Sequence, residues 1–219
     1  MARRTLSSAW IVLGVLMGLI GSGLGNTQNA FAIEQPQYSV LESHAFEGNT
    51  IELRTYAPYL VAETTVEAQD FDQASSEGFK RLAAFIFGEN NGNVKMDMTA
   101  PVETRRPEKM DMTAPVATGG KPGAWNVRFV MPSKYTLATL PRPNDSRVRI
   151  IEVPARTVAV ISFSGRWTLA NFSEHTVRLE RFLAEAGITS VSEPVVARYN
   201  MPLTPWFLRT NEIQIEVTP

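Results

Sequence analysis

The sequence predicts an α+β fold: a distorted antiparallel β-barrel made of two duplicated βαββ halves, with two helices packed outside. Two observations lead to this prediction. The same succession of strands, a capped helix and further strands occurs twice, in residues 38–131 and 148–217. The two helix starts also lie 101 residues apart, and the two glycines that end the helices lie 99 apart. One half alone buries too little apolar surface to be stable, whereas two halves can share one core.

In the first half, residues 38–41, 51–56 and 60–66 are rich in β-branched side chains, which predicts strands. Asp70 is predicted to cap a helix, because its carboxylate can accept from the free amides of the first turn, with Gln73 reaching back from the third position. An apolar stripe at helical spacing follows, made of Phe79, Leu82, Ala83 and Ile86, and Gly88 ends the helix. Further strands are predicted over residues 94–102, 109–116 and 125–131.

The second half repeats this pattern, with strands predicted over residues 148–151 and 158–163. Asn171 is predicted to open the second helix as Asp70 opens the first, and Gly187 is predicted to end it. The apolar stripe of this helix consists of Phe172, His175, Leu179, Phe182, Leu183 and Ala186. Strands over residues 195–199 and 212–217 complete the half.

Composition narrows the classes of function. The 219 residues include no cysteine, which excludes disulfides, thiolate nucleophiles and Cys-ligated zinc. Residues 1–32 have the pattern of a signal peptide: Arg3 and Arg4 precede an apolar run, and Ala30-Phe31-Ala32 has the small-x-small form of a cleavage site. We therefore expect a periplasmic or secreted protein cleaved near Ala32, with an N-terminal membrane anchor as the alternative.

The rest of the chain, residues 33–219, carries 19 basic and 22 acidic side chains, a formal net charge of −3. No basic block suggests nucleic-acid binding, and no segment after residue 32 is expected to span a membrane. The sequence also contains no Ser-His-Asp pattern, HExxH motif or phosphate-binding glycine loop, so no enzymatic activity is expected. The oligomeric state is left open.

The octapeptide KMDMTAPV occurs twice, over residues 95–102 and 109–116. In a strand, Met96, Met98, Ala100 and Val102 would share one face. If a turn over residues 103–108 pairs the two copies, all four methionines of the repeat share an apolar face. Three interpretations follow: core packing, an adaptable wall for a flat apolar ligand, or a Cu(I) site. A paired strand face spreads the thioethers instead of gathering them at one point, which weakens the copper interpretation.

Five segments resemble the SOUL haem-binding family, in order and over nearly all of residues 38–217. They are IELRTYAPYLVAETTV (51–66), FKRLAAFIFGENNGN (79–93), KMDMTAPV (95–102 and 109–116), WNVRFVMPSKYTLATLPRPND (125–145) and RYNMPLTPWFLRTNEIQIEV (198–217). The resemblance implies a barrel of two βαββ halves with helices outside, in agreement with the duplication. It also implies binding of haem, which need not be obligatory, or of a related tetrapyrrole.

In some members of this family, haem rests in a shallow apolar cleft between the first helix and the loop before the last strand. The resemblance implies that the binding residues here are Phe79, Lys80, Arg81, Ala83, Phe87, Tyr199, Leu203, Trp206, Phe207 and Arg209. Lys80, Arg81 and Arg209 are the cations expected to meet the haem propionates. Thr55 stands where a family member has a haem-ligating histidine, which leaves His175 as a weak candidate for an iron ligand.

The resemblance thus implies a non-enzymatic haem or tetrapyrrole carrier, buffer or scavenger of the bacterial cell envelope. The alternative is a module that has lost haem binding and instead binds another hydrophobic small molecule or a protein.

Overall fold

Strands and helices follow one another in each half largely as the sequence predicts. The computed structural model describes residues 33–106 and 123–218. The first half contains β1 (Tyr38–Phe46), β2 (Asn49–Tyr56), β3 (Tyr59–Ala68), α1 (Phe71–Ile86), β4 (Val102–Arg105) and β5 (Gly123–Val130). The second contains β6 (Val148–Val153), β7 (Arg156–Phe163), α2 (Leu169–Ala186), β8 (Val195–Arg198), the 3-10 helix η1 (Trp206–Leu208) and β9 (Asn211–Glu216). The predicted signal peptide lies outside the described residues.

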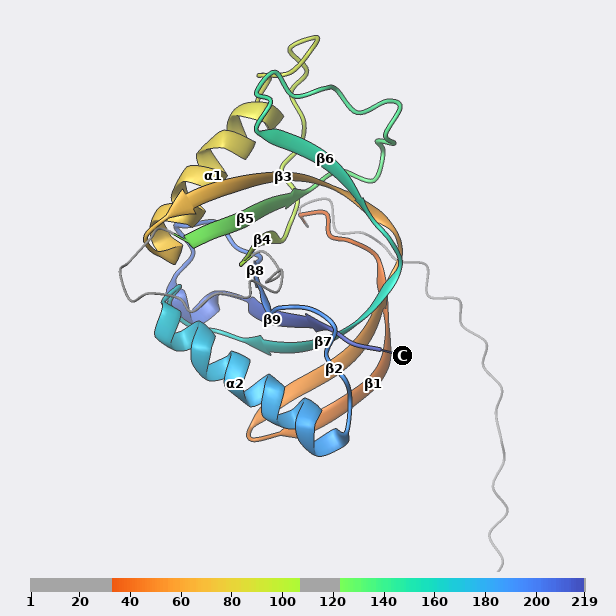
Figure 1. The fold of residues 1–219 in the computed structure, drawn as a ribbon, viewed down its shortest axis with the longest axis vertical. Coiled ribbons are helices and arrows are strands. Elements are labelled where there is room, and N and C mark those ends of the chain that lie inside the picture. The colour runs from red at the N-terminus through yellow and green to blue at the C-terminus, as the bar shows by residue number, and fades with distance from the viewer. Residues whose placement is uncertain (1–32, 107–122, 219) are drawn as a thin grey trace, which may run out of the picture. The chain divides into compact units, whose positions relative to one another are not determined.

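The nine strands form one antiparallel sheet in the order β1-β2-β7-β9-β8-β4-β5-β3-β6 (Figure 1). Without β1, this order is symmetric. From one end, the order runs β2, β7, β9, β8. From the other end it runs β6, β3, β5, β4, and each strand is the equivalent of the one at the same place in the first series. Each half therefore repeats the unit strand-strand-helix-strand-strand, which is the arrangement that a duplication produces.

The strand pairings form an open order, unlike the predicted barrel. Strands β1 and β6 end the order, and among the described residues no pairing joins them. However, β2 continues into β3 through residues 57–58, and β6 continues into β7 through residues 154–155. Each link contains a proline, which has no amide hydrogen for a ladder bond. Among the described residues, the two ends of the sheet are therefore connected by the covalent chain and not by a ladder of hydrogen bonds.

Both helices pack on one face of the curved sheet. The two main apolar clusters lie between the helices and this face. Helix α1 packs on β3 and β5, and α2 packs on β7 and β9 (Figure 1). The two helices begin next to each other, because the ring of Phe71 in α1 lies 5.3 Å from that of Phe172 in α2. Within the described part of the chain, no helix has the length and apolar character needed to span a membrane.

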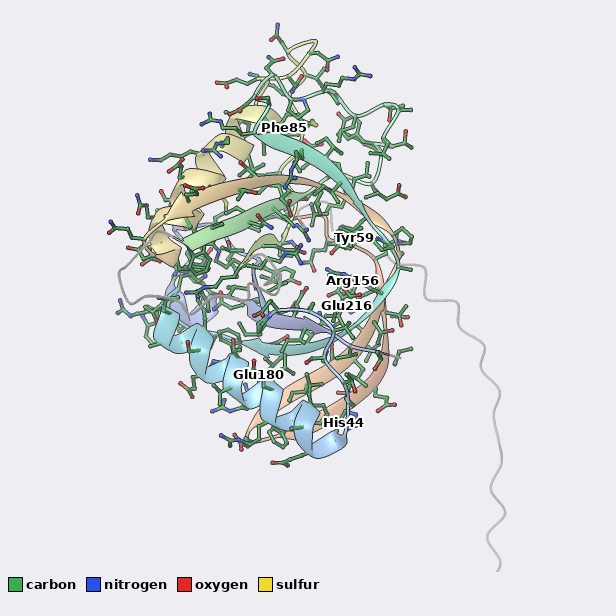
Figure 2. All side chains as sticks on the ribbon, viewed as in Figure 1. His44, Tyr59, Phe85, Arg156, Glu180 and Glu216 are labelled. Atoms are coloured by element: carbon green, nitrogen blue, oxygen red, sulfur yellow. The ribbon has the colours of Figure 1, made fainter. Side chains whose placement is uncertain are left out.

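The face of the sheet that points away from the helices, which we call the polar inner face, is buried and carries charged side chains beside two small apolar clusters. Its buried charged residues include Arg54, Glu63, Glu103, Arg128 and Glu212. Strand alternation explains the contrast, since neighbours such as Leu53 and Ile213 point to the helix side. Further along this face, Arg156 donates to the hydroxyl of Tyr59 over 2.7 Å and pairs with Glu216 at 3.5 Å (Figure 2).

The helix ends confirm one predicted cap and correct the other. The carboxylate of Asp70 accepts from the amide of Gln73 over 2.8 Å, as predicted. Helix α2 begins earlier than predicted, because Thr168 is its cap and accepts from the amide of Asn171 over 3.3 Å. The side chain of Asn171 instead donates to the carbonyl of Arg166 over 3.0 Å, so it stabilises the preceding turn.

The first octapeptide copy is not a strand over residues 94–101, so that prediction is wrong. The amide of Met96 donates to the carbonyl of Ile86, and the amide of Ala100 donates to that of Glu34, so neither joins a neighbouring strand. Met96 is buried and Met98 is partly buried in the apolar cluster under α1. This agrees with the core-packing interpretation for these two methionines. The second copy lies outside the described residues.

Candidate functional site

The loop between β8 and β9 exposes several large apolar side chains in eight consecutive residues. We call residues 201–208 the apolar loop. Leu203 is 93% exposed and Trp206 is 49% exposed. The other exposed side chains are those of Met201, Phe207 and Leu208. Large apolar side chains gathered on a surface mark a place where another molecule binds.

Hydrogen bonds from Arg209 and Thr210 support the base of the apolar loop. Arg209 donates from Nε to the carbonyl of Thr204 and from Nη2 to that of Pro202, both over 2.8 Å. The amide of Thr210 donates to the side chain of Asn200 over 2.5 Å. Arg209 therefore pairs two carbonyls of the loop, and the exposed apolar side chains lie above this hydrogen-bonded base.

The turn before α2 is the second part of this site. The amide of Gly165 donates to the carbonyl of Trp206 over 3.0 Å, and the indole of Trp167 donates to Asn211 over 2.7 Å. The guanidinium carbon of Arg166 lies 5.8 Å from the centre of the Trp206 ring. Arg166 is exposed, so it adds a positive charge at the edge of the apolar loop.

Gly165 is the residue that allows this turn. Its φ of +126° is a conformation that other residues rarely adopt. A Cβ atom here would lie 2.7 Å from Nδ2 of Asn171, the side chain that ties the turn to α2. Residues 165–167 were not predicted as site residues, although an arginine and a tryptophan directly before a helix cap are a signal that an exposed turn can carry function.

The predicted binding residues of the loop lie together, but Arg209 has another role than expected. Leu203, Trp206 and Phe207 share the exposed surface. Arg209 is committed to two loop carbonyls, and its guanidinium carbon lies 4.1 Å from the centre of the Trp167 ring. Its main part is therefore to shape the loop.

The predicted binding residues of α1 either pack between this helix and the sheet or are exposed on the helix surface. Phe79 packs on Phe129 with ring centres 5.2 Å apart, and Ala83 is partly buried in the same cluster. Phe87 and Lys80 are exposed. Among the described residues, no hydrogen bond, ion pair or ring contact joins this group to the apolar loop, whereas Trp206 of the loop contacts Gly165 and Arg166.

Arg81 does not have the free guanidinium expected of a rim cation. It donates to the hydroxyl of Thr64 over 2.7 Å and to the carbonyl of Thr65 over 3.1 Å. It also donates to Glu77, one helical turn before it, over 2.8 Å. These acceptors fix Arg81 between α1 and β3, which is a structural role.

Tyr199 anchors the start of the loop to the polar inner face. Its hydroxyl donates to Glu212 over 2.5 Å and accepts from Gln214 over 3.3 Å. Burial raises the pKa of Tyr199 well above its ordinary value, and the charge of Glu212 raises it further. The raised pKa disfavours the phenolate form that iron binding requires.

His175, the weak candidate for an iron ligand, belongs to the core under α2. Its Nδ1 lies 2.8 Å from the carbonyl oxygen of Asn171, one turn earlier. Its ring stacks on Phe163 with centres 3.7 Å apart and planes 9° apart. Its burial and stacking explain why this residue lies on the apolar stripe, and they give it a packing role.

Comparisons with known proteins agree on one family and one fold. The family model of the SOUL heme-binding protein matches residues 33–216. Heme-binding protein 2 of Homo sapiens is 29% identical over 198 residues, which cover 87% of this chain and 93% of that protein. Heme-binding protein 1 of Xenopus laevis is 26% identical over 197 residues, which cover 82% of this chain and 94% of that protein.

Solved structures show the same fold at low sequence identity. The C-terminal domain of EcmrR is similar with a TM-score of 0.58 and 14% identity, over 78% of this chain and 98% of that chain. An uncharacterised conserved protein from Listeria innocua is similar with a TM-score of 0.55 and 10% identity, over 77% of this chain and 92% of that chain.

Proposed function

This chain belongs to the SOUL heme-binding protein family, and from that premise we propose that it is a non-enzymatic carrier, buffer or scavenger of haem or a related tetrapyrrole. The observation that carries the proposal is the apolar loop, an ordered surface of exposed aromatic and aliphatic side chains with a cation at its edge. The proposed place of action is the bacterial cell envelope, after removal of residues 1–32.

The residues of the apolar loop suit a flat, apolar ring. Trp206 and Phe207 form an edge-to-face pair with ring centres 5.6 Å apart and planes at 87°, and both rings are exposed. Leu203 adds the most exposed aliphatic side chain. Arg166 is the cation placed to meet a propionate, because Arg209 is already bound to backbone carbonyls.

The residues present fit the porphyrin ring better than the iron. Thr55 stands at the position that carries a histidine in a family member, and His175 is held in the core by Asn171 and Phe163. In this proposal, apolar contact and stacking supply the affinity, and no protein side chain ligates the iron.

Titration of the purified protein with haemin, followed in the Soret band, tests the proposal. We expect a saturable shift at micromolar haemin. Trp206→Ala should weaken binding by about tenfold, since base or ring stacking on an aromatic is worth about 1–3 kcal/mol. Val191→Ala, which truncates an exposed apolar residue outside the loop, is the matched control and should bind normally. Absence of a saturable shift in the unaltered protein would refute haem binding.

A second candidate function is a module for another hydrophobic small molecule or for a protein. Thr55 favours it, because the histidine-ligated mode of binding is lost. Mass spectrometry of molecules that co-purify with the protein from its native compartment separates the two candidates. Recovery of haem supports the first, and recovery of a different ligand with no haem supports the second.

A further inference from the structure

The side chains of the apolar loop project into solvent. Leu203 is 93% exposed, and Met201, Phe207 and Leu208 are each more than half exposed. A side chain in the wall of a cleft loses a large part of its surface to the rest of the wall, whereas Leu203 keeps nearly all of it. A projecting apolar surface of this kind suits a partner much larger than a single ring.

The start of α2 adds to this surface. The short helix η1 lies beside the first turn of α2 (Figure 1), and the amide of Gly165 donates to the carbonyl of Trp206. Leu169, the first residue of α2, is exposed, and Arg166 precedes it by three residues. Two segments of the chain therefore contribute exposed apolar side chains, with a cation between them.

Both segments are free of acidic residues although the protein as a whole is acidic. Residues 194–211 and residues 153–173 each contain two arginines and no Asp or Glu. The remainder of residues 33–219 carries 15 basic and 22 acidic side chains. Asp70 and Asp72, at the start of α1, bound the positive region on the side where the two helices meet. The charge of this surface is therefore complementary to an anionic partner.

The residue types are those found at a bilayer interface. Tryptophan is enriched there because its ring is apolar and its N–H is polar, and Trp206 belongs to this loop. Arginine can lay its apolar stem along such a surface and keep its charge among the headgroups, which suits Arg166. Anionic phospholipid therefore matches both the apolar side chains and the charge.

The backbone of the loop is also suited to a medium with little water. Pro202 and Pro205 have no amide hydrogen, so they bring no donor that needs a partner. Arg209 pairs the carbonyls of Pro202 and Thr204. Because an unpaired backbone group is costly in lipid, these features lower the cost of bringing the loop into contact with a bilayer.

We propose that the apolar loop inserts into the interfacial layer of an anionic phospholipid bilayer, with Arg166 at the level of the headgroup phosphates. Leu203, Phe207 and Leu208 supply the apolar contact, and Trp206 lies at the boundary between headgroups and acyl chains. The inference goes beyond the proposed function and does not rest on haem binding, although it uses the same loop.

Flotation with lipid vesicles measures this docking. The test uses residues 33–219, which form a compact unit with every described element, because the apolar run in residues 9–24 has a lipid affinity of its own. We expect saturable binding to vesicles of phosphatidylglycerol and phosphatidylcholine in equal parts. Binding should be weaker to phosphatidylcholine alone and at high salt, since the arginine contribution is electrostatic.

Leu203→Glu tests the apolar contact. Vesicle affinity should fall at least about tenfold, because an exposed leucine no longer enters the bilayer. Its unfolding midpoint should stay the same, since the side chain of Leu203 is almost fully exposed in the folded protein. Val191→Glu, at an exposed apolar residue outside the loop, is the control and should bind vesicles like the unaltered protein.

Arg166→Gln tests the charge. It should lose about fivefold in affinity for the anionic vesicles, which is the contribution of one arginine near such a surface. Arg142→Gln, at an exposed arginine in the loop before β6, is the matched control and should bind like the unaltered protein.

Brominated acyl chains locate the loop, because they quench fluorophores within the bilayer. They should quench the unaltered protein. In Trp206→Phe, vesicle binding should remain and the quenching should be lost, since Trp125 is buried and Trp167 is partly buried within the protein.

Three results would overturn the proposal: no binding of the unaltered protein to anionic vesicles, equal binding by Leu203→Glu, or equal quenching in Trp206→Phe. Sedimentation supplies a further check. Self-association that Leu203→Glu abolishes, without vesicle binding, would make the loop a contact between copies and refute the lipid proposal. No sample contains haemin, so failure here is distinct from failure of the haemin titration.

Discussion

Arg54 on β2 donates to Glu212 on β9 over 2.9 Å, across the intervening strand β7, and both side chains are buried. Glu212 also accepts from the hydroxyl of Tyr199, the residue that begins the loop before β9. One carboxylate thus links β2 and β9 of the polar inner face to the support of the apolar loop.

Removal of that carboxylate should cost much of the stability of the fold. Glu212→Ala leaves Arg54 buried beside a single remaining carboxylate, Glu52, at 2.7 Å. We expect a loss of about 3 kcal/mol in the free energy of unfolding, at the lower end of the range for a broken buried pair. Glu52→Ala, at the more exposed partner, should cost less than about 1 kcal/mol. Urea denaturation followed by tryptophan fluorescence measures both, and equal losses would contradict this account.

The buried tyrosines should make the protein sensitive to alkali. Burial raises the pKa of Tyr56 to about 12, and it raises the pKa values of Tyr59 and Tyr199 as well. Between the unfolded pKa of about 10 and the folded pKa, the folded state keeps protons that the unfolded state loses. Stability should therefore fall as pH rises above 10, by up to about 1.4 kcal/mol per pH unit for each tyrosine.

Arg198 works in the opposite direction in this range, since its folded pKa of about 10 lies below that of the unfolded chain. Because Arg198 alone opposes the three tyrosines, the free energy of unfolding should still fall as pH rises. Urea denaturation followed by circular dichroism at each pH from 9 to 12 gives the slope. Tyr56→Phe should make it shallower, and a slope as steep as that of the unaltered protein would count against the tyrosine explanation.

His175→Ala should destabilise the protein without changing the haem spectrum. The substitution removes a ring that stacks on Phe163 in the core, for an expected loss of about 2 kcal/mol. The Soret band of the haemin complex should keep its position, because this histidine is proposed to pack and not to bind iron. Val177→Ala, on the exposed face of the same helix, is the control. A Soret shift specific to His175→Ala would restore the iron-ligand role.

Gly78→Ala should destabilise α1 although alanine favours helices. In an exposed helix this change gains about 1 kcal/mol. Here the new Cβ would lie 2.5 Å from a methyl carbon of Val127 on β5, so overpacking should cost about 1–3 kcal/mol. The double variant Gly78→Ala with Val127→Ala should lose less than the sum of the two single losses, because the two sites share the contact. Strict additivity would show that the close packing is not the cause.

Local patterns predicted the helices and the duplication well, because they act over a few residues. Asp70 caps α1 through the amide of Gln73, and Gly187 ends α2 with a φ of +68°. The cap of α2 was missed because Thr168 and Asn171 have equally suitable side chains, and only the contact of Asn171 with the preceding turn separates them.

The features that the sequence did not predict are those set by contacts between segments far apart in the chain. Alternation suggested a strand through Met96, but the amides of that segment find partners at the end of α1 and near Glu34. The family resemblance implied that Arg81 is a free cation, yet its guanidinium donates to Thr64 and to the carbonyl of Thr65 on β3. Likewise, the contact of Gly165 with Trp206 joins segments about 40 residues apart, which no local motif reveals.

The symmetric strand order has a consequence for how the molecule holds together. Strand β2 of the first half pairs with β7 of the second, and β6 of the second half pairs with β3 of the first. Each half thus gives one strand to the other, which is the topology of a strand-swapped dimer whose two copies are joined into one chain. Neither half can unfold without exposing a bare strand edge of the other, so the two halves should melt in a single transition.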